Sequence, residues 1–108
     1  MISGDTNPTD ATIEACHGCD VLIHEVLSLG YLTKRPEFQA YAAKYHTTTT
    51  QLAQLAGRAK PGLVILYHHS VAFRPGIDSR LSSPEDLLNE VRSGYSGRVV
   101  VGRDLDVY

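Results

Sequence analysis

The stretch that decides the fold runs from Leu63 to Ser70 and reads LVILYHHS. Its unbroken apolar start is typical of a strand that is buried on both faces. Two histidines follow directly where the apolar run ends. In open α/β sheets, ligands bind at the carboxyl ends of the strands. We therefore expect polar side chains at this end of the strand to form a functional site.

A second segment has the same design. VLIHEV, residues 21–26, is apolar apart from His24 and Glu25 near its end. RVVVG, residues 98–102, predicts a third strand, and LDVY, residues 105–108, alternates like a short edge strand. The start MIS could be the tail of a further strand.

Helices are expected between these strands. Thr48 and Gln51 have the spacing of a capping box, in which each side chain bonds the other residue's backbone N–H. Ser83 followed by Pro84 is typical of a helix start, because proline favours the first helical position. Two further helices, from an Asn7 cap to about Cys16 and over residues 36–44, and a turn at Pro75–Gly76 complete the pattern.

The alternation of helix and strand predicts one α/β domain, residues 1–108, with mostly parallel strands. The chain is 43% hydrophobic and 20% charged, and its net charge of -2 gives no sign of a nucleic-acid surface. No apolar run approaches the roughly 18 residues of a membrane span. The N-terminus also lacks the pattern of a signal peptide. We therefore expect a cytoplasmic protein with no membrane partner.

Four polar positions are expected on one rim of this sheet. They are Asp5, the pair His24–Glu25, His46 and the pair His68–His69. Carboxylates and imidazoles are ordinary ligands of zinc and other divalent ions. Adjacent residues on a strand point to opposite faces, so only one member of each pair can face a site. From the spacing alone, the alternative stays open that Asp5 only stabilises a turn and that the histidines are structural.

Cys16 and Cys19 form the motif CHGC. Such a pair could be a redox site or half of a zinc site. A structural zinc site needs a second pair of ligands at similar spacing, which this chain does not have. The pair also lies at the expected C-terminal end of a helix, where the helix dipole disfavours a thiolate. We therefore expect two small, partly buried residues.

Five motifs occur along the chain in the order SGDT, DVLIHE, HTT before a helix, LVILYHHS and VVVGRDLDV. Together they resemble the C-terminal half of the metallo-β-lactamase superfamily, on the branch that contains ribonuclease Z and related metal-dependent hydrolases. The resemblance covers nearly the whole chain. It implies half of an αββα sandwich, with one mixed sheet and helices on one face of that sheet.

The resemblance also implies roles for individual residues. Asp5 of SGDT matches the carboxylate that bridges two metal ions, and His68 of LYHHS matches the last histidine ligand. Glu25 and His46 match a pair that donates a proton to the leaving group. The implied cofactor is a divalent metal, zinc before others. The implied substrate is RNA or another phosphodiester, or an ester.

The superfamily's main metal motif, H-x-H-x-D-H, does not occur in these 108 residues. Because a catalytic zinc site usually has three protein ligands, we expect a half-protein that is inert as a lone chain. The strands at 21–26 and 63–67 are apolar on both faces, whereas helices can cover only one. We therefore expect a homodimer through the bare sheet face, or a complementary N-terminal half, to cover the other.

Three functional hypotheses follow. The first is part of a metal-dependent hydrolase. The second is a non-enzymatic, oligomerising α/β module that retains the site residues. The third is an anion-binding domain, since the helix start after His46 offers free N–H groups, although the threonines there could serve only as caps.

Overall fold

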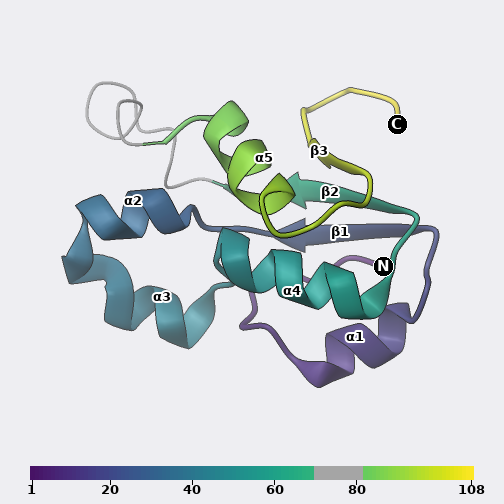
Figure 1. Ribbon diagram of the computed structural model, residues 1–108, viewed down its shortest axis with the longest axis horizontal. Coiled ribbons are helices and arrows are strands. Elements are labelled where there is room, and N and C mark those ends of the chain that lie inside the picture. Colours follow the sequence, from purple (N-terminus) through teal and green to yellow (C-terminus); the bar gives the residue numbers. More distant parts are fainter. Residues whose placement is uncertain (70–81) are drawn as a thin grey trace.

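A computed structural model describes residues 1–69 and 82–108 (Figure 1). The predicted turn at Pro75–Gly76 lies outside the described residues. None of the described helices has the length and apolarity needed to cross a membrane. The elements are α1 (Asp10–Cys16), β1 (Val21–Glu25), α2 (Leu29–Lys34), the short 3₁₀ helix η1 (Pro36–Phe38), α3 (Gln39–Tyr45), α4 (Thr49–Ala59), β2 (Leu63–Tyr67), α5 (Pro84–Arg92) and β3 (Val99–Val101).

The three strands form one sheet in the order β1-β2-β3, and both neighbouring pairs are parallel. The α/β prediction is confirmed, while the antiparallel strand of a mixed sheet does not occur in the described parts of the chain. Ile2 forms a parallel bridge with Ile23, so the segment MIS does extend the sheet beyond β1. The edge strand predicted at 105–108 is wrong. The chain turns there, because Leu105 adopts a left-handed φ of 68°, which interrupts extended backbone.

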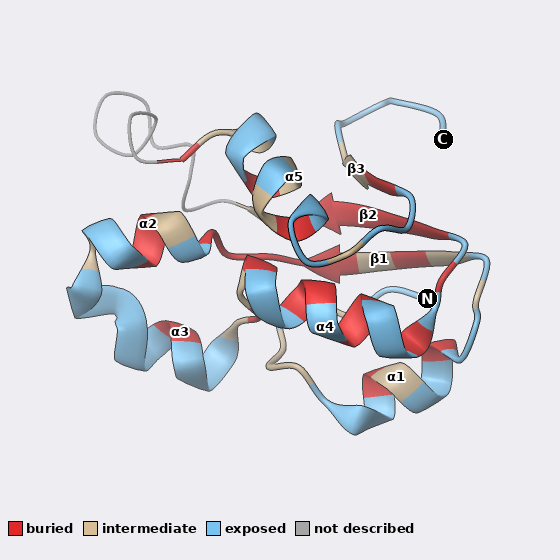
Figure 2. Cartoon of the chain, in the orientation of Figure 1, coloured by how far each residue is buried: buried red, intermediate tan, exposed pale blue. Residues whose placement is uncertain are grey.

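Helices α1, α4 and α5 build the main core against one face of the sheet, and α2 and α3 form a second, smaller cluster with Leu27 (Figure 2). Leu22, Val64 and Leu66 contribute to this core from the strands. The apolar stripe predicted on α4 contributes Leu52, Leu55, Ala56 and Ala59, all buried. On the opposite face, Ile23 pairs in register with Ile65, and Ile65 pairs with Val100. None of these three belongs to the main core cluster, so this second face carries a separate apolar row, in which Ile65 is buried while Ile23 and Val100 are partly exposed.

The helix starts show how local sequence sets the boundaries. Both predicted starts carry complete capping boxes, Thr48 with Gln51 and Ser83 with Asp86. The predicted Asn7 cap of α1 is wrong. Thr9 caps this helix instead, because its side chain accepts the N–H of Thr12 and leaves Pro8 outside the helix.

Helix α2 was not expected from the sequence, and a distant side chain explains it. The carboxylate of Glu90, on α5, accepts hydrogen bonds from the hydroxyls of Ser28 at 2.9 Å and Thr49 at 2.6 Å. It also accepts the N–H groups of Leu29 at 3.0 Å and Gly30 at 3.3 Å, in the first turn of α2. A helix of six residues is too short to be stable by itself, so this contact stabilises it.

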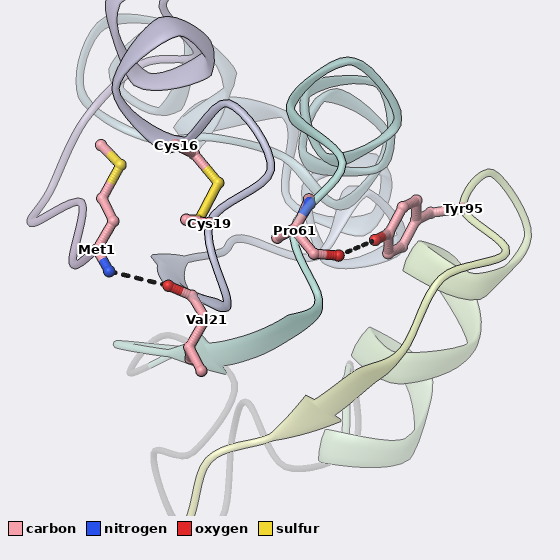
Figure 3. The surroundings of a disulfide bond; sticks show 6 residues. All are labelled: Met1, Cys16, Cys19, Val21, Pro61 and Tyr95. Atoms are coloured by element: carbon pink, nitrogen blue, oxygen red, sulfur yellow. Dashed lines mark hydrogen bonds between the residues drawn. A yellow bond between two sulfur atoms is a disulfide. The ribbon is translucent and has the colours of Figure 1, made fainter.

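Cys16 and Cys19 form a disulfide, which corrects the prediction of two unbonded small residues (Figure 3). His17 and Gly18 between them both have left-handed φ values, of 33° and 80°. This tight turn brings the two Cα atoms to 4.8 Å, within the range that a disulfide spans. The bridge lies before Val21, where β1 begins, and therefore at the rim opposite the carboxyl ends of the strands.

Candidate functional site

Four chain segments meet at the carboxyl ends of β1 and β2. Glu25 is the last residue of β1 and is paired with Tyr67, the last residue of β2, so His68 follows one residue beyond the sheet. Asp5 follows Gly4, whose positive φ of 65° turns the chain away from the bridge at Ile2. His46 lies between α3 and α4. The fold thus brings the four predicted site residues to one rim.

Asp5 and His68 form the outer pair of this site. The distance between Asp5 Oδ1 and His68 Nδ1 is 2.8 Å, and both side chains reach solvent. His68 has a φ of 48°, a left-handed conformation that is uncommon for residues other than glycine. Strain of this kind is found at functional sites more often than elsewhere. It also means that β2 ends at Tyr67, so alternation along a strand does not decide which way His68 and His69 point.

Glu25 and His46 form the inner pair. Glu25 is 1% exposed, and its Oε2 lies 3.3 Å from His46 Nδ1. Its other oxygen, Oε1, accepts the backbone N–H of Thr47 at 2.7 Å and that of Thr6 at 3.4 Å. Burial raises the pKa of the Glu25 carboxyl, while the Thr47 N–H and the nearby His46 imidazole act to lower it.

The two pairs touch. Ligand atoms of Glu25, His46 and His68 all lie within 4.8 Å of one another, and the imidazole rings of His46 and His68 are 6.1 Å apart between centroids. Two carboxylates and two imidazoles are a donor set that suits a divalent cation. Glu25 Oε2 strengthens this match, because it is buried and makes no well-aligned hydrogen bond within the described part of the chain. The residues present therefore fit a metal ion.

His24 does not join the site. It is fully buried, and its Nδ1 lies 2.7 Å from the carbonyl oxygen of Glu25. Because a carbonyl only accepts, Nδ1 carries the proton of the neutral ring. Burial lowers the pKa of His24, despite the opposing effect of that hydrogen bond. As expected for neighbours on a strand, one member of the pair His24–Glu25 faces the site and the other faces the core.

This buried histidine predicts a loss of stability in acid. Because burial lowers the pKa of His24 in the folded chain, the unfolded chain binds a proton at a higher pH, near the ordinary pKa of about 6.5. The free energy of unfolding is therefore unaffected by His24 above that pH and falls as the pH drops below it. Urea unfolding at pH 7.5 and at pH 5.5 should show that the free energy of unfolding of His24→Leu decreases less between the two pH values than that of the wild type. The exposed His17→Gln serves as control and should behave like the wild type. Part of the loss should persist, since burial also lowers the pKa of His69. An unchanged loss in His24→Leu would contradict this assignment.

Thr6 and Thr47 were not predicted as site residues. Both hold Glu25 through backbone N–H groups. Every residue except proline has such a group, so no sequence signal could have identified them. Thr47 has a further role, because its hydroxyl donates to the carbonyl of Thr6 at 2.6 Å and ties the Asp5 segment to the His46 segment.

Comparison with known proteins identifies relatives of the chain. No family model matches it. Ribonuclease Z of Parasynechococcus marenigrum is 35% identical over 100 residues, which cover 93% of this chain and 29% of that protein. Ribonuclease Z of Thermoplasma acidophilum is 32% identical over 113 residues, which cover 98% of this chain and 34% of that protein. Ribonuclease Z of Mycobacterium tuberculosis H37Rv is 29% identical over 109 residues, which cover 97% of this chain and 37% of that protein. The chain thus spans about a third of the length of these relatives.

A solved structure shows the same fold. The metallo-beta-lactamase fold protein YhfI from Bacillus subtilis matches with a TM-score of 0.73 and 19% identity, over 99% of this chain and 38% of that one. Both comparisons confirm the resemblance that the five motifs indicated. They also agree with each other that the chain corresponds to one part of a larger protein fold.

Proposed function

We infer that this chain is part of a metal-dependent hydrolase of the metallo-β-lactamase superfamily, on its ribonuclease Z-like branch. The observation that carries this inference is the convergence of Asp5, Glu25, His46 and His68 at one rim of the sheet. The similarity to ribonuclease Z over nearly the whole chain supports it. The substrate that we propose is RNA or another phosphodiester.

Asp5 and His68 are proposed as metal ligands, with zinc as the preferred ion. When bound, a divalent ion activates water as a nucleophile and polarises the phosphoryl oxygen. In the structure these two side chains form a close pair instead. A metal held by both would therefore replace the contact between Asp5 Oδ1 and His68 Nδ1.

Glu25 and His46 are proposed to donate a proton to the leaving group. The Glu25 carboxylate lies beside His46 Nδ1 and so orients the ring. The backbone N–H groups of Thr47 and Thr6 hold that carboxylate in place. A histidine oriented in this way can act as a general acid near neutral pH. The same two side chains, together with His68, could instead ligate a metal, and the two roles make different predictions.

The site in this chain needs a complement. Four side chains are present, but we propose that only Asp5 and His68 are primary ligands, which is fewer than a catalytic zinc site uses. Glu25 projects to the same side of the sheet as Ile23, the side with the separate, partly exposed apolar row. A second copy of the chain or an N-terminal half placed on that row would therefore lie beside the site. We propose that the chain is inert until such a partner supplies the missing ligands.

Metal titration tests this proposal directly. Isothermal titration of the 108-residue chain with zinc should show binding that falls at least about tenfold in Asp5→Asn and in His68→Gln, as expected when one ligand of a site is lost. Asp104→Asn and His17→Gln make the same chemical changes at exposed positions and should bind like the wild type.

Two results would count against the metal proposal. One is a wild-type chain that binds no zinc, manganese or iron either alone or when completed by a segment that carries H-x-H-x-D-H. The other is affinity that does not change in the two site variants. Light scattering on the same samples gives the oligomeric state, and a stable dimer without metal would favour the non-enzymatic module.

We also propose a cytoplasmic location. Thiols are kept reduced in most cytoplasms, so Cys16 and Cys19 would be two free thiols there rather than a disulfide. The disulfide lies at the rim opposite the site, and the proposed chemistry does not use it.

A further inference from the structure

Helix α3 has an unusual distribution of side chains. The residue that it buries is Ala42, whereas Tyr41 is 56% exposed and Tyr45 is 45% exposed. Phe38, at the N-cap of α3, is also exposed. Positions 38, 41 and 45 follow the three- and four-residue spacing of one helix face. A large apolar face that points to solvent in this way indicates a binding surface.

Tyr41 and Tyr45 lie next to the candidate site. The ring centroids of Tyr45 and Tyr41 are 5.0 Å apart, and those of Tyr41 and His46 are 5.4 Å apart. His46 in turn lies beside Glu25 and His68. The rings are tilted by 48° and 53° to one another, so they do not cover each other face to face. An aromatic surface thus begins at the site and extends outward along α3.

Positive charge accompanies this surface. Lys44 is exposed, and its Nζ lies 5.2 Å from the centre of the Tyr45 ring. Arg35 lies 5.3 Å from the centre of the Phe38 ring, although it also pairs with Glu37 at 2.6 Å. Since that pair is neutral overall, Lys44 supplies the charge that is available to an anion. Aromatic rings with an interleaved cation suit a nucleotide strand, whose bases stack and whose phosphates are negative.

We propose that Tyr41 and Tyr45 form a stacking subsite for an unpaired nucleobase next to the phosphodiester that the site holds. This inference rests on the proposed function. Proteins recognise single-stranded RNA largely by stacking splayed bases on aromatic side chains. Tyr41 receives the base nearest to His46, Tyr45 extends the platform, and Lys44 contacts the backbone phosphate.

Binding of a short oligonucleotide tests the subsite. The probe is a 5′-fluorescein hexamer of adenylate, measured by fluorescence anisotropy at low salt, with and without zinc. Tyr41→Ala should weaken binding about tenfold, the usual effect of removing one stacking ring. Tyr41→Phe keeps the ring and should bind within about twofold of the wild type. Lys44→Gln should reduce the slope of log affinity against log salt by about one.

The matched control is Tyr108→Ala. Tyr108 is 54% exposed, close to the value for Tyr41, and the C-terminus lies on the other side of the molecule from α3 (Figure 1). Its replacement should leave binding unchanged. Because Tyr41 is exposed, its replacement should not impair folding, and circular dichroism of each variant checks this.

A probe without bases sharpens the test. An abasic hexamer has the same phosphates, so it should bind the wild type about as weakly as the adenylate probe binds Tyr41→Ala. The abasic probe should also be insensitive to the Tyr41 substitution. Equal affinity for the RNA and DNA hexamers would support stacking through the base alone. Tighter binding of RNA would support stacking with an added ribose contact.

Several outcomes would overturn the subsite. The first is a wild-type chain that does not bind the hexamer. The second and third are a hexamer affinity of Tyr41→Ala equal to that of the wild type, and a wild-type affinity for the abasic probe equal to that for the adenylate probe. The fourth is a dimer that dissociates in Tyr41→Ala, which would make this face an interface between copies. These outcomes are separate from failure of the proposed function. If the chain binds zinc but Tyr41→Ala does not change its affinity for the hexamer, the subsite alone is refuted. If the chain binds the hexamer through its bases but binds no metal, the metal site alone is refuted.

Discussion

Replacing His46 with glutamine is expected to slow phosphodiester hydrolysis by about 10²–10⁴-fold, the usual contribution of a general acid. The assay uses the chain completed by a segment that carries H-x-H-x-D-H, with a generic aryl phosphodiester as substrate. His46 lies 3.3 Å from Glu25, and glutamine is a polar side chain of similar size that cannot act as an acid at neutral pH. Glu25→Gln should reduce the rate in the same direction, because it removes the charge that orients the ring.

Metal content separates the two roles of this pair. If His46 and Glu25 transfer protons, both variants retain wild-type zinc content while the rate falls. If they ligate the metal together with His68, zinc content falls in parallel with the rate, and the assignment as proton donors is wrong. His17→Gln should affect neither quantity. An aryl substrate with a good leaving group should be less sensitive to His46→Gln than one with a poor leaving group, since it needs less help from an acid.

Replacing Glu90 with alanine is expected to lower the free energy of unfolding by about 2–3 kcal/mol, as for the loss of a charged, multiply hydrogen-bonded acceptor. Its carboxylate accepts from two hydroxyls and from two backbone N–H groups of α2. Ser28 and Thr49, which donate the hydroxyls, are themselves buried and would be left without this acceptor. Urea unfolding followed by circular dichroism measures the change.

Glu85→Ala is the matched control for Glu90. It removes the same charge from the same helix but at an exposed position in the first turn, where the helix dipole accounts for at most about 1 kcal/mol. Glu90→Gln retains one acceptor oxygen and should lie between the two. Hydrogen exchange should show that Glu90→Ala opens α2 before the rest of the chain. A loss of less than about 0.5 kcal/mol would show that α2 does not depend on this contact.

Much of the site could be anticipated because its residues occur at ends of elements with clear local signals. Glu25 and His68 follow apolar runs, and parallel strands bring their carboxyl ends to one rim. The grouping into Asp5 with His68 and Glu25 with His46 came from a resemblance, and the structure places the residues in the same two pairs. Their chemical roles remain predictions. The aromatic face of α3 was not anticipated, because only a structure shows that tyrosines at helical spacing point to solvent.

The errors had both local and distant causes. Helix α2 depends on Glu90, some sixty residues along the chain, and its own six residues have too little helical stability to be predicted. The disulfide depends on two left-handed residues, His17 and Gly18, of which only glycine carries a sequence signal. The segment 105–108 alternates like a strand, but an alternating pattern does not supply the neighbour with which a strand must pair.

The sequence by itself determined the three strands β1, β2 and β3, the capped starts of α4 and α5, and the rim that carries the site. It could do so because caps, apolar runs and alternation act over a few residues. Only the tertiary structure decided which atoms meet: Asp5 with His68, Glu25 with two backbone N–H groups, and Tyr41 with His46. Apart from the contact of Tyr41 with His46, which lie five residues apart, those contacts join segments far apart in the chain. Their distances follow from how helices and sheet pack together, which no local pattern encodes.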